Sequence, residues 1–243
     1  MKIPRIRRVW PRWIRIIVEV WGAAFGKSGE TPKPVDVPVG TGQQPPTAII
    51  SPMFLIKRPT NEAVRGFLAG QQSQPFSYPE IGASRLVVPD GYNVDHNRLK
   101  LGEGRETFAK AVEALKHWKM FEMDWIEIAP RDARIMKGSC VAITVRHFGF
   151  RSLNVSRIVY VIEEHGAPER FGFAYGTLPG HVEQGEERFS VEYHPADKSV
   201  WYDVFAFSRP RHILARLGYP ISRHLQKRFA RDSLKAMERA VNR

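Results

Sequence analysis

Residues 200–240 read VWYDVFAFSRPRHILARLGYPISRHLQKRFARDSLKAMERA, and the spacing of their apolar side chains changes partway along. Up to Phe207 apolar and polar residues alternate, which is typical of a strand with one buried face. Gly218 ends a first helical piece, and Pro220 fits the first position of a longer helix. That helix carries one apolar stripe, formed by Ile221, Leu225, Phe229, Ser233, Met237 and Ala240. A long C-terminal helix that covers a sheet is therefore predicted.

Shorter segments upstream complete the predicted sheet. They alternate with a period of two, and turns rich in glycine or proline separate them. Helices are predicted over 61–71 and from Arg105 to Trp118. The predicted strands are Met120–Ile128, Ser139–His147, Ser156–Glu163, Phe171–Thr177, Glu187–Tyr193 and Val200–Phe207, with earlier extended stretches at Ile49–Lys57 and Tyr92–Leu101.

Together these elements predict an α+β domain. A twisted antiparallel sheet or partial barrel of about six or seven strands has one apolar face to bury, and the long C-terminal helix can cover it. This arrangement resembles the helix-grip fold of the START and birch-pollen-allergen superfamily, in which the sheet wraps the last helix and leaves an apolar cavity. A closed β-barrel threaded by the last helix is the alternative.

Several stretches of the chain also match a sequence family. They include FSYPEIGASR from Phe76, GYNVDHNRLKLGEG from Gly91, KHWKMF ending at Phe121, LNVSRIVYVIEE from Leu153 and FGFAYGTLPGHVEQGEERFSVE from Phe171, followed by most of the stretch quoted above. From about Asn61 to residue 241 the sequence resembles a family of plant and bacterial proteins, the domain of unknown function DUF1990. The resemblance implies no particular reaction.

Positive charge gathers at the two ends of the chain. The net charge is +12, yet residues 1–27 hold seven Lys or Arg against one acidic residue, and residues 209–243 hold ten against two. The remaining middle part is close to neutral. Basic ends suit a polyanionic surface, although they can also serve only to keep a protein soluble. Nucleic acid is an unlikely partner here, because no recognisable reading module accompanies the charge.

An amphipathic, basic helix is predicted within residues 1–27. Its apolar arc is too wide for a helix that rests on a small core, and residues 11–25 would span roughly 22 Å, less than the about 30 Å of a bilayer core. We therefore expect it to lie in a membrane surface or against a membrane-embedded partner. A helix packed on the body is the alternative; a signal peptide fits less well, since Arg15 and Glu19 interrupt the apolar run. The expected anchoring residues are Trp10, Trp13, Ile14, Ile17, Trp21 and Phe25, with Arg12 and Arg15.

These features divide the chain into three parts. Residues 1–27 form the anchor and residues 28–49 form a linker that is rich in proline and glycine. Residues 50–243 form the α+β domain.

The densest group of polar side chains lies around the turn Pro179-Gly180. If this hairpin borders a cavity, His181 could act as a general base that a glutamate orients, because an imidazole titrates near neutral pH. The alternative is that these residues only build and solvate the turn. The candidate ligand-binding residues are Tyr175, Thr177, His181, Glu186, Glu187 and Arg188.

No cofactor or metal ion is expected. His181 and Glu183, combined with His147, His165 or His194, match no known ligand spacing. The sequence has neither a complete glycine-rich phosphate loop nor a nucleophile motif. The single cysteine, Cys140, lies in an apolar strand pattern and is expected to be inert.

Three functions remain open from the sequence. The first is a noncatalytic, peripheral protein on the cytoplasmic face of a membrane, as an accessory or structural subunit of a membrane protein complex. The second is a binder of an apolar small molecule or lipid in a helix-grip cavity. The third is an enzyme that uses the His181 region.

Overall fold

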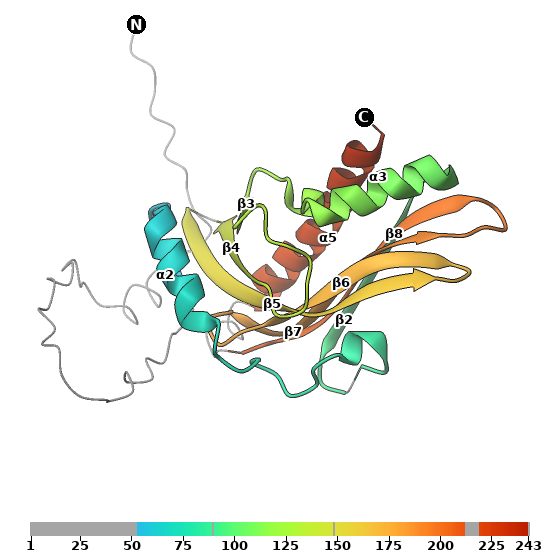
Figure 1. Cartoon of the computed structure of the whole chain (residues 1–243). Coiled ribbons are helices and arrows are strands. Elements are labelled where there is room, and N and C mark those ends of the chain that lie inside the picture. The colour runs from blue at the N-terminus through green and yellow to red at the C-terminus, as the bar shows by residue number, and fades with distance from the viewer. Residues whose placement is uncertain (1–52, 89, 148, 212–218, 243) are drawn as a thin grey trace, which may run out of the picture. The chain divides into compact units, whose positions relative to one another are not determined.

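One antiparallel sheet organises the domain (Figure 1). The computed structural model describes residues 53–88, 90–147, 149–211 and 219–242. The strand order is β2-β8-β7-β6-β5-β4-β3, and a short β1 (Met53–Leu55) pairs with β5. The strands are β2 (Asn93–Glu103), β3 (Ile126–Ala129), β4 (Cys140–His147), β5 (Phe150–His165), β6 (Glu169–Thr177), β7 (Glu183–Tyr193) and β8 (Ser199–Pro210).

The long C-terminal helix is α5, Tyr219–Val241, and it crosses one face of the sheet (Figure 1). The sheet places β2, the first strand of the main series, beside β8, the last. Helix α3 (Gly104–Lys116) and the short helix η2 (Lys119–Phe121) connect β2 to β3 on the same side as α5. This is the predicted helix-grip arrangement. It is open, because β2 and β3 are its two edge strands in the described part of the chain.

We call the face that α5 covers the inner face. Its largest fully buried side chains include Trp118, Phe173, Phe189 and Met237. The ring centroids of Trp118 and Phe173 lie 4.9 Å apart, and those of Phe173 and Phe189 lie 5.5 Å apart. Such contacts stabilise a core beyond the burial of area alone.

A second, smaller core lies under α2, Asn61–Gln71. Thr60 caps this helix by accepting a hydrogen bond from the backbone N–H of Ala63 at 3.1 Å, as a threonine at this position should. Val64 and Phe67 on α2 pack with Leu153 and Leu178.

The predicted stripe on α5 is confirmed. Ser233 and Met237 are buried, and Leu225, Phe229 and Ala240 are partly buried and pack against the core. The ring of Phe229 lies 5.3 Å from that of Phe121 between centroids.

Other differences have local causes. The predicted strand Met120–Ile128 begins only at Ile126. Trp118 adopts a left-handed backbone, with φ of 55°, and η2 then turns Met120 and Phe121 into the core. The predicted membrane-anchoring helix of 1–27 and the linker of 28–49 lie outside the described residues.

Substitution of Met237 tests whether α5 is an integral part of the core. Met237→Ala should lower the free energy of unfolding by about 2–5 kcal/mol, because it removes a fully buried side chain and leaves a cavity. Urea unfolding measures the loss. Lys235→Ala, on the exposed side of the same helix, is the matched control and should change stability little. Equal stability of Met237→Ala and the native chain would place α5 outside the core.

Candidate functional site

A tyrosine and a glutamate form a pair on the inner face of the sheet. Tyr175 on β6 lies directly opposite Glu187 on β7, and its hydroxyl donates a hydrogen bond to Glu187 Oε2 at 2.6 Å. The ring of Tyr175 packs on Phe189, with centroids 5.4 Å apart. The pKa of Glu187 is raised to about 7: burial raises it most, the Tyr175 hydrogen bond lowers it, and the charge of nearby Asp95 raises it. Burial also raises the pKa of Tyr175, so the phenol stays protonated.

The same row of the sheet continues across two more strands. Glu187 lies opposite Ala206 on β8, and Ala206 lies opposite Asp95 on β2. Asp95 binds the guanidinium of Arg223 on α5 through two hydrogen bonds, of 2.5 Å and 2.7 Å. This bidentate pair joins the N-terminal half of α5 to the edge of the sheet.

Glu183 completes the acidic side of this region. It lies four residues before Glu187 on β7 and is only 7% exposed. Its Oε1 accepts a hydrogen bond from the hydroxyl of Ser222 on α5, whereas its Oε2 is buried and has no hydrogen-bond partner among the described residues. Burial raises the pKa of Glu183, and the Ser222 hydrogen bond and the Arg223 charge lower it. We call Asp95, Tyr175, Glu183, Glu187 and Arg223 the inner polar cluster.

Glu186 lies on the opposite, outer face of the sheet and holds a loop. Its carboxylate accepts hydrogen bonds from Tyr78 Oη at 2.7 Å, from the Gly82 backbone N–H at 2.8 Å and from the Ser84 backbone N–H at 3.1 Å, and it also accepts one from Ser84 Oγ. Residues 77–86, here called the outer loop, are thereby fixed on the sheet. All the donors come from the chain itself, so Glu186 acts as a structural tether.

Arg188 also lies on the outer face. Its guanidinium donates to the Ser84 backbone oxygen at 2.7 Å and to Asp203 Oδ1 at 3.2 Å. Asp203 in turn contacts His96 Nε2 at 2.5 Å. Arg188 thus supports the outer loop together with Glu186.

Thr177 and His181 serve the local hairpin. Thr177 Oγ1 accepts from the Gly185 N–H at 3.0 Å and contacts Ser77 Oγ at 2.6 Å. His181 Nδ1 accepts a hydrogen bond from the backbone N–H of Glu183 at 3.0 Å. Burial lowers the pKa of His181 to about 4, so its ring is neutral at pH 7. No glutamate side chain is hydrogen-bonded to His181 among the described residues.

The six predicted site residues therefore do not form one group. Tyr175 and Glu187 come together on the inner face, Glu186 and Arg188 on the outer face, and Thr177 and His181 at the turn. Successive side chains of a strand alternate between faces, so alternation separates Glu186 from Glu187, while the register of β6 against β7 places Tyr175 beside Glu187. Asp95 and Arg223 were missed, since their pairing joins residues far apart in the chain.

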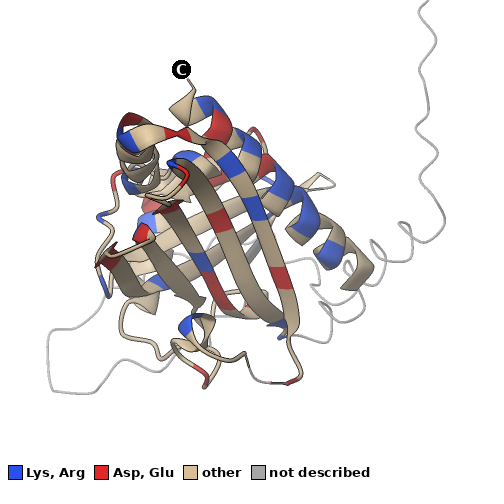
Figure 2. Ribbon diagram, turned by 90° about the vertical axis from the view of Figure 1, so that its right-hand side faces the viewer, with Lys and Arg blue, Asp and Glu red and all other residues tan. Residues whose placement is uncertain are grey.

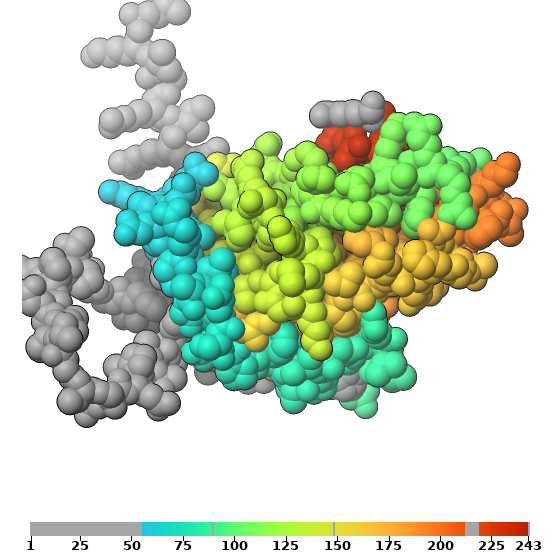
Figure 3. Space-filling view, viewed as in Figure 1, coloured from blue at the N-terminus to red at the C-terminus, as the bar shows by residue number. Residues whose placement is uncertain are grey.

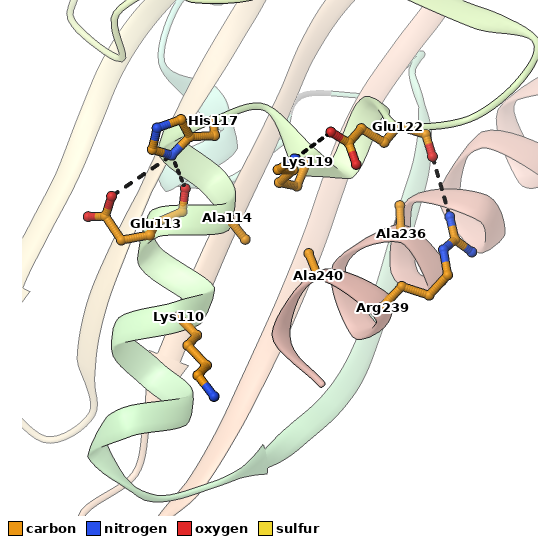
Figure 4. Close-up of a pocket in the computed structure, with 9 residues that line it drawn as sticks. All are labelled: Lys110, Glu113, Ala114, His117, Lys119, Glu122, Ala236, Arg239 and Ala240. Atoms are coloured by element: carbon orange, nitrogen blue, oxygen red, sulfur yellow. Dashed lines mark hydrogen bonds and ion pairs between the residues drawn. The ribbon is translucent and has the colours of Figure 1, made fainter. Parts of the chain in front are cut away.

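A surface pocket of about 360 Å³ lies elsewhere, between α3, η2 and the end of α5 (Figure 4). Ala114, Ala236 and Ala240 face the space between the helices. Its two carboxylates are already paired with lysines of the chain, Glu113 with Lys116 and Glu122 with Lys119. The other lining residues are Lys110, His117 and Arg239. The pocket lining thus has three basic side chains, Lys110, Lys119 and Arg239, and two carboxylates, so its net charge is small.

Neither a metal-ion cluster nor a membrane-spanning helix is present among the described residues. In the part of the chain that the structure describes, no cluster of three or more His, Cys, Asp or Glu side chains could hold a metal ion. Likewise, none of the helices described is long and apolar enough to span a bilayer.

Comparison with known proteins gave relatives along most of the chain. A family model described as "Domain of unknown function (DUF1990)" matches residues 77–236. A UPF0548 protein of Dictyostelium discoideum is 33% identical over 207 residues, covering 78% of this chain and 96% of that protein. A UPF0548 protein of Deinococcus radiodurans is 36% identical over 201 residues, covering 78% of this chain and 99% of that protein.

Solved structures show more distant likeness. The crystal structure of Ara h 8.0201 is 15% identical, covers 62% of this chain and 98% of its own, and gives a TM-score of 0.41. The crystal structure of human STARD10 is 10% identical, covers 77% of this chain and 81% of its own, and gives a TM-score of 0.43.

Two neighbouring glutamates provide a matched pair of substitutions. Glu186→Gln should destabilise the fold by about 1–3 kcal/mol, because an amide nitrogen cannot accept the bonds of the buried donors that Glu186 holds. Hydrogen exchange in residues 77–86 should also accelerate. Glu187→Gln should have a much smaller effect, since its one described partner, the Tyr175 hydroxyl, can still donate to an amide oxygen. Equal effects in urea unfolding would contradict the assignment of Glu186 as the tether.

Proposed function

The chain belongs to the DUF1990 (UPF0548) family, and from this premise we propose that it binds a small, largely apolar molecule between the inner face of its sheet and α5. The Tyr175–Glu187 pair is the polar anchor of the site. The observation that carries the proposal is a carboxylate held within the helix–sheet interface with one described hydrogen-bond partner.

Partial exposure along the interface supports this choice. Glu187 and Ala206 lie in the inner-face row, and Leu225 and Phe229 lie on α5, yet all four remain partly exposed. Solvent therefore reaches the sheet beneath the N-terminal half of the helix. Ala206, between Glu187 and Asp95 in this row, contributes only a methyl side chain.

The lining is suited to an apolar body with a polar end. Aromatic rings of Tyr175, Phe121 and Phe229 lie on the side of the packed core. The inner polar cluster lies at the other side. Binding sites commonly combine a mostly apolar wall with a few polar groups that fix the orientation of the ligand.

Catalysis by His181 is less well supported than binding. A ring with a pKa of about 4 is neutral at pH 7 but is a weak base. Glu187, with a pKa of about 7, is closer to the value that a general base needs. An enzyme that used this region would therefore use Glu187 in preference to His181.

Filling the space beside Glu187 tests the binding site. We expect 1-hexanol to shift the NMR signals of the Glu187 and Ala206 backbone amides in the native chain. Ala206→Leu should remove these shifts, because the added side chain projects into the proposed site. Val94→Leu, at a residue that is 51% exposed, is the control and should leave them intact. Shifts that survive in Ala206→Leu, or no response to hexanol in the native chain, would contradict the proposed site.

A second function, attachment to the cytoplasmic face of a membrane or to a membrane protein complex, is supported by charge. Residues 1–27 carry seven Lys or Arg and three tryptophans. In addition, Lys227, Arg231, Lys235 and Arg239 are exposed on α5 at four-residue spacing. Figure 2 shows basic positions recurring along a long helix. Each basic residue near an anionic surface contributes about 1 kcal/mol to attachment.

Deletion of residues 1–27 tests attachment. The full chain should sediment with vesicles that contain phosphatidylserine, and less with vesicles of phosphatidylcholine alone. The truncated chain should remain in the supernatant, because it lacks the tryptophans and seven of the basic residues. If both chains sediment alike, residues 1–27 are not the attachment segment.

A further inference from the structure

The inner polar cluster carries more carboxyl groups than basic groups. Three carboxylates, Asp95, Glu183 and Glu187, accompany one guanidinium, that of Arg223. Asp95 already occupies Arg223 through two hydrogen bonds. Neither Glu183 nor Glu187 forms an ion pair within 4 Å among the described residues. Two carboxyl groups in the helix–sheet interface therefore lack a paired cation among the residues that the structure describes.

The carboxyl groups of Glu183 and Glu187 also have unused acceptor positions for hydrogen bonds. An ionised carboxylate offers about four acceptor positions. Glu187 has one described donor, Tyr175 Oη, and Glu183 has one, Ser222 Oγ. The second oxygen of Glu183 is buried and has no partner among the described residues, and the whole residue is only 7% exposed. A buried acceptor that no described group satisfies is costly unless a ligand or water supplies the donor.

We propose that the ligand of this site carries a protonated amine, which binds to Glu187 and Glu183. The inference rests on the proposed binding function and adds the chemical class of the ligand. An ammonium group offers three donors and no acceptor, and it neutralises one of the unpaired carboxylates. A fatty acid or a phosphate would bring a further negative charge beside them. The cation of the ligand is organic, because no described set of side chains could hold a metal ion.

The aromatic surroundings accommodate such a ligand. The ring of Tyr175 lies beside Glu187, and an aromatic face attracts a cation. The partly exposed side chains of Leu225 and Phe229 can contact the apolar part of the molecule. The amine thus defines one end of the ligand and a short apolar body the other.

Three probes that share a six-carbon chain separate the effect of head-group charge on affinity from the effect of the apolar chain. Hexylamine, 1-hexanol and hexanoate are titrated into the full chain at pH 8, and binding is followed by calorimetry and by the amide signals of Glu187 and Ala206. We expect hexylamine to bind more tightly than hexanol by about tenfold or more, as charge-assisted hydrogen bonds require. Hexanoate should bind most weakly.

Two variants test whether Glu187 and Glu183 cause the preference for hexylamine over hexanol. In Glu187→Gln and in Glu183→Gln the affinity for hexylamine should fall towards that of hexanol, and the affinity for hexanol should change little. Glu163→Gln, at an exposed position of β5, is the control and should keep the preference. Thermal unfolding of each variant verifies that it is folded.

The pH dependence gives an independent test. Hexylamine remains protonated between pH 5 and pH 8, so any change reflects the protein. Its affinity should rise as Glu187 ionises through its pKa of about 7, in a site that also contains Asp95, Glu183, Arg223, Tyr175 and Tyr202. The affinity for hexanol should not rise.

The outcomes distinguish the two proposals. Binding of hexanol equal to or tighter than that of hexylamine would overturn the amine assignment and leave the binding site standing. Tightest binding of hexanoate would overturn it in the same way. If none of the three probes shifts the inner-face amides, both proposals fail.

Discussion

The alternation of side chains along β7 is the constraint on which the rest of the structure depends. Glu186 and Glu187 are neighbours in the chain, yet a strand must direct them to opposite faces. One carboxylate therefore faces the outer loop and the other faces α5. The outer face is completed by hydrogen bonds from Tyr78, Gly82 and Ser84. On the inner face, Glu187 and Glu183 each accept a single hydrogen bond from the described residues.

Two neighbouring residues of one strand therefore have different roles: Glu186 stabilises the fold, and Glu187 is available for the proposed binding. The buried carboxylate of Glu186 accepts several hydrogen bonds and fixes the loop that supplies the donors. A carboxylate with one donor in an apolar setting keeps its proton to higher pH and retains the capacity to bind. The packed end of the helix–sheet interface, around Phe173, Phe189 and Met237, provides the rigid frame that such a site needs.

Local patterns in the sequence predicted the elements but not their partners. The stripe on α5 and the strands β6 and β8 follow from periods of 3.6 and two, which depend on nearby residues alone. The start of β3 was wrong, because the left-handed turn at Trp118 overrides an apparently continuous strand pattern.

The candidate site could be predicted only in part, for a related reason. Tyr175 and Glu187 were predicted because they belong to the densest group of polar side chains in the sequence. Their separation from Glu186 and Arg188 required a fixed register, and the pairing of Asp95 with Arg223 joins residues 128 positions apart. Contacts of that range depend on how β2 lies against β8 and α5, which no local period encodes.

The opposite pKa shifts of His181 and Glu187 have a consequence for the proton balance of unfolding. His181 titrates at about 4 when folded and near 6.5 when unfolded, so its contribution to stability is lost as the pH falls through that interval. Glu187 titrates at about 7 when folded and near 4.5 when unfolded, so its contribution is lost as the pH rises through its interval. Where the two intervals overlap, unfolding takes up a proton at the imidazole and releases one at the carboxyl. In mildly acidic solution the contributions of these two groups therefore oppose each other, and the pair adds little to the pH dependence of stability.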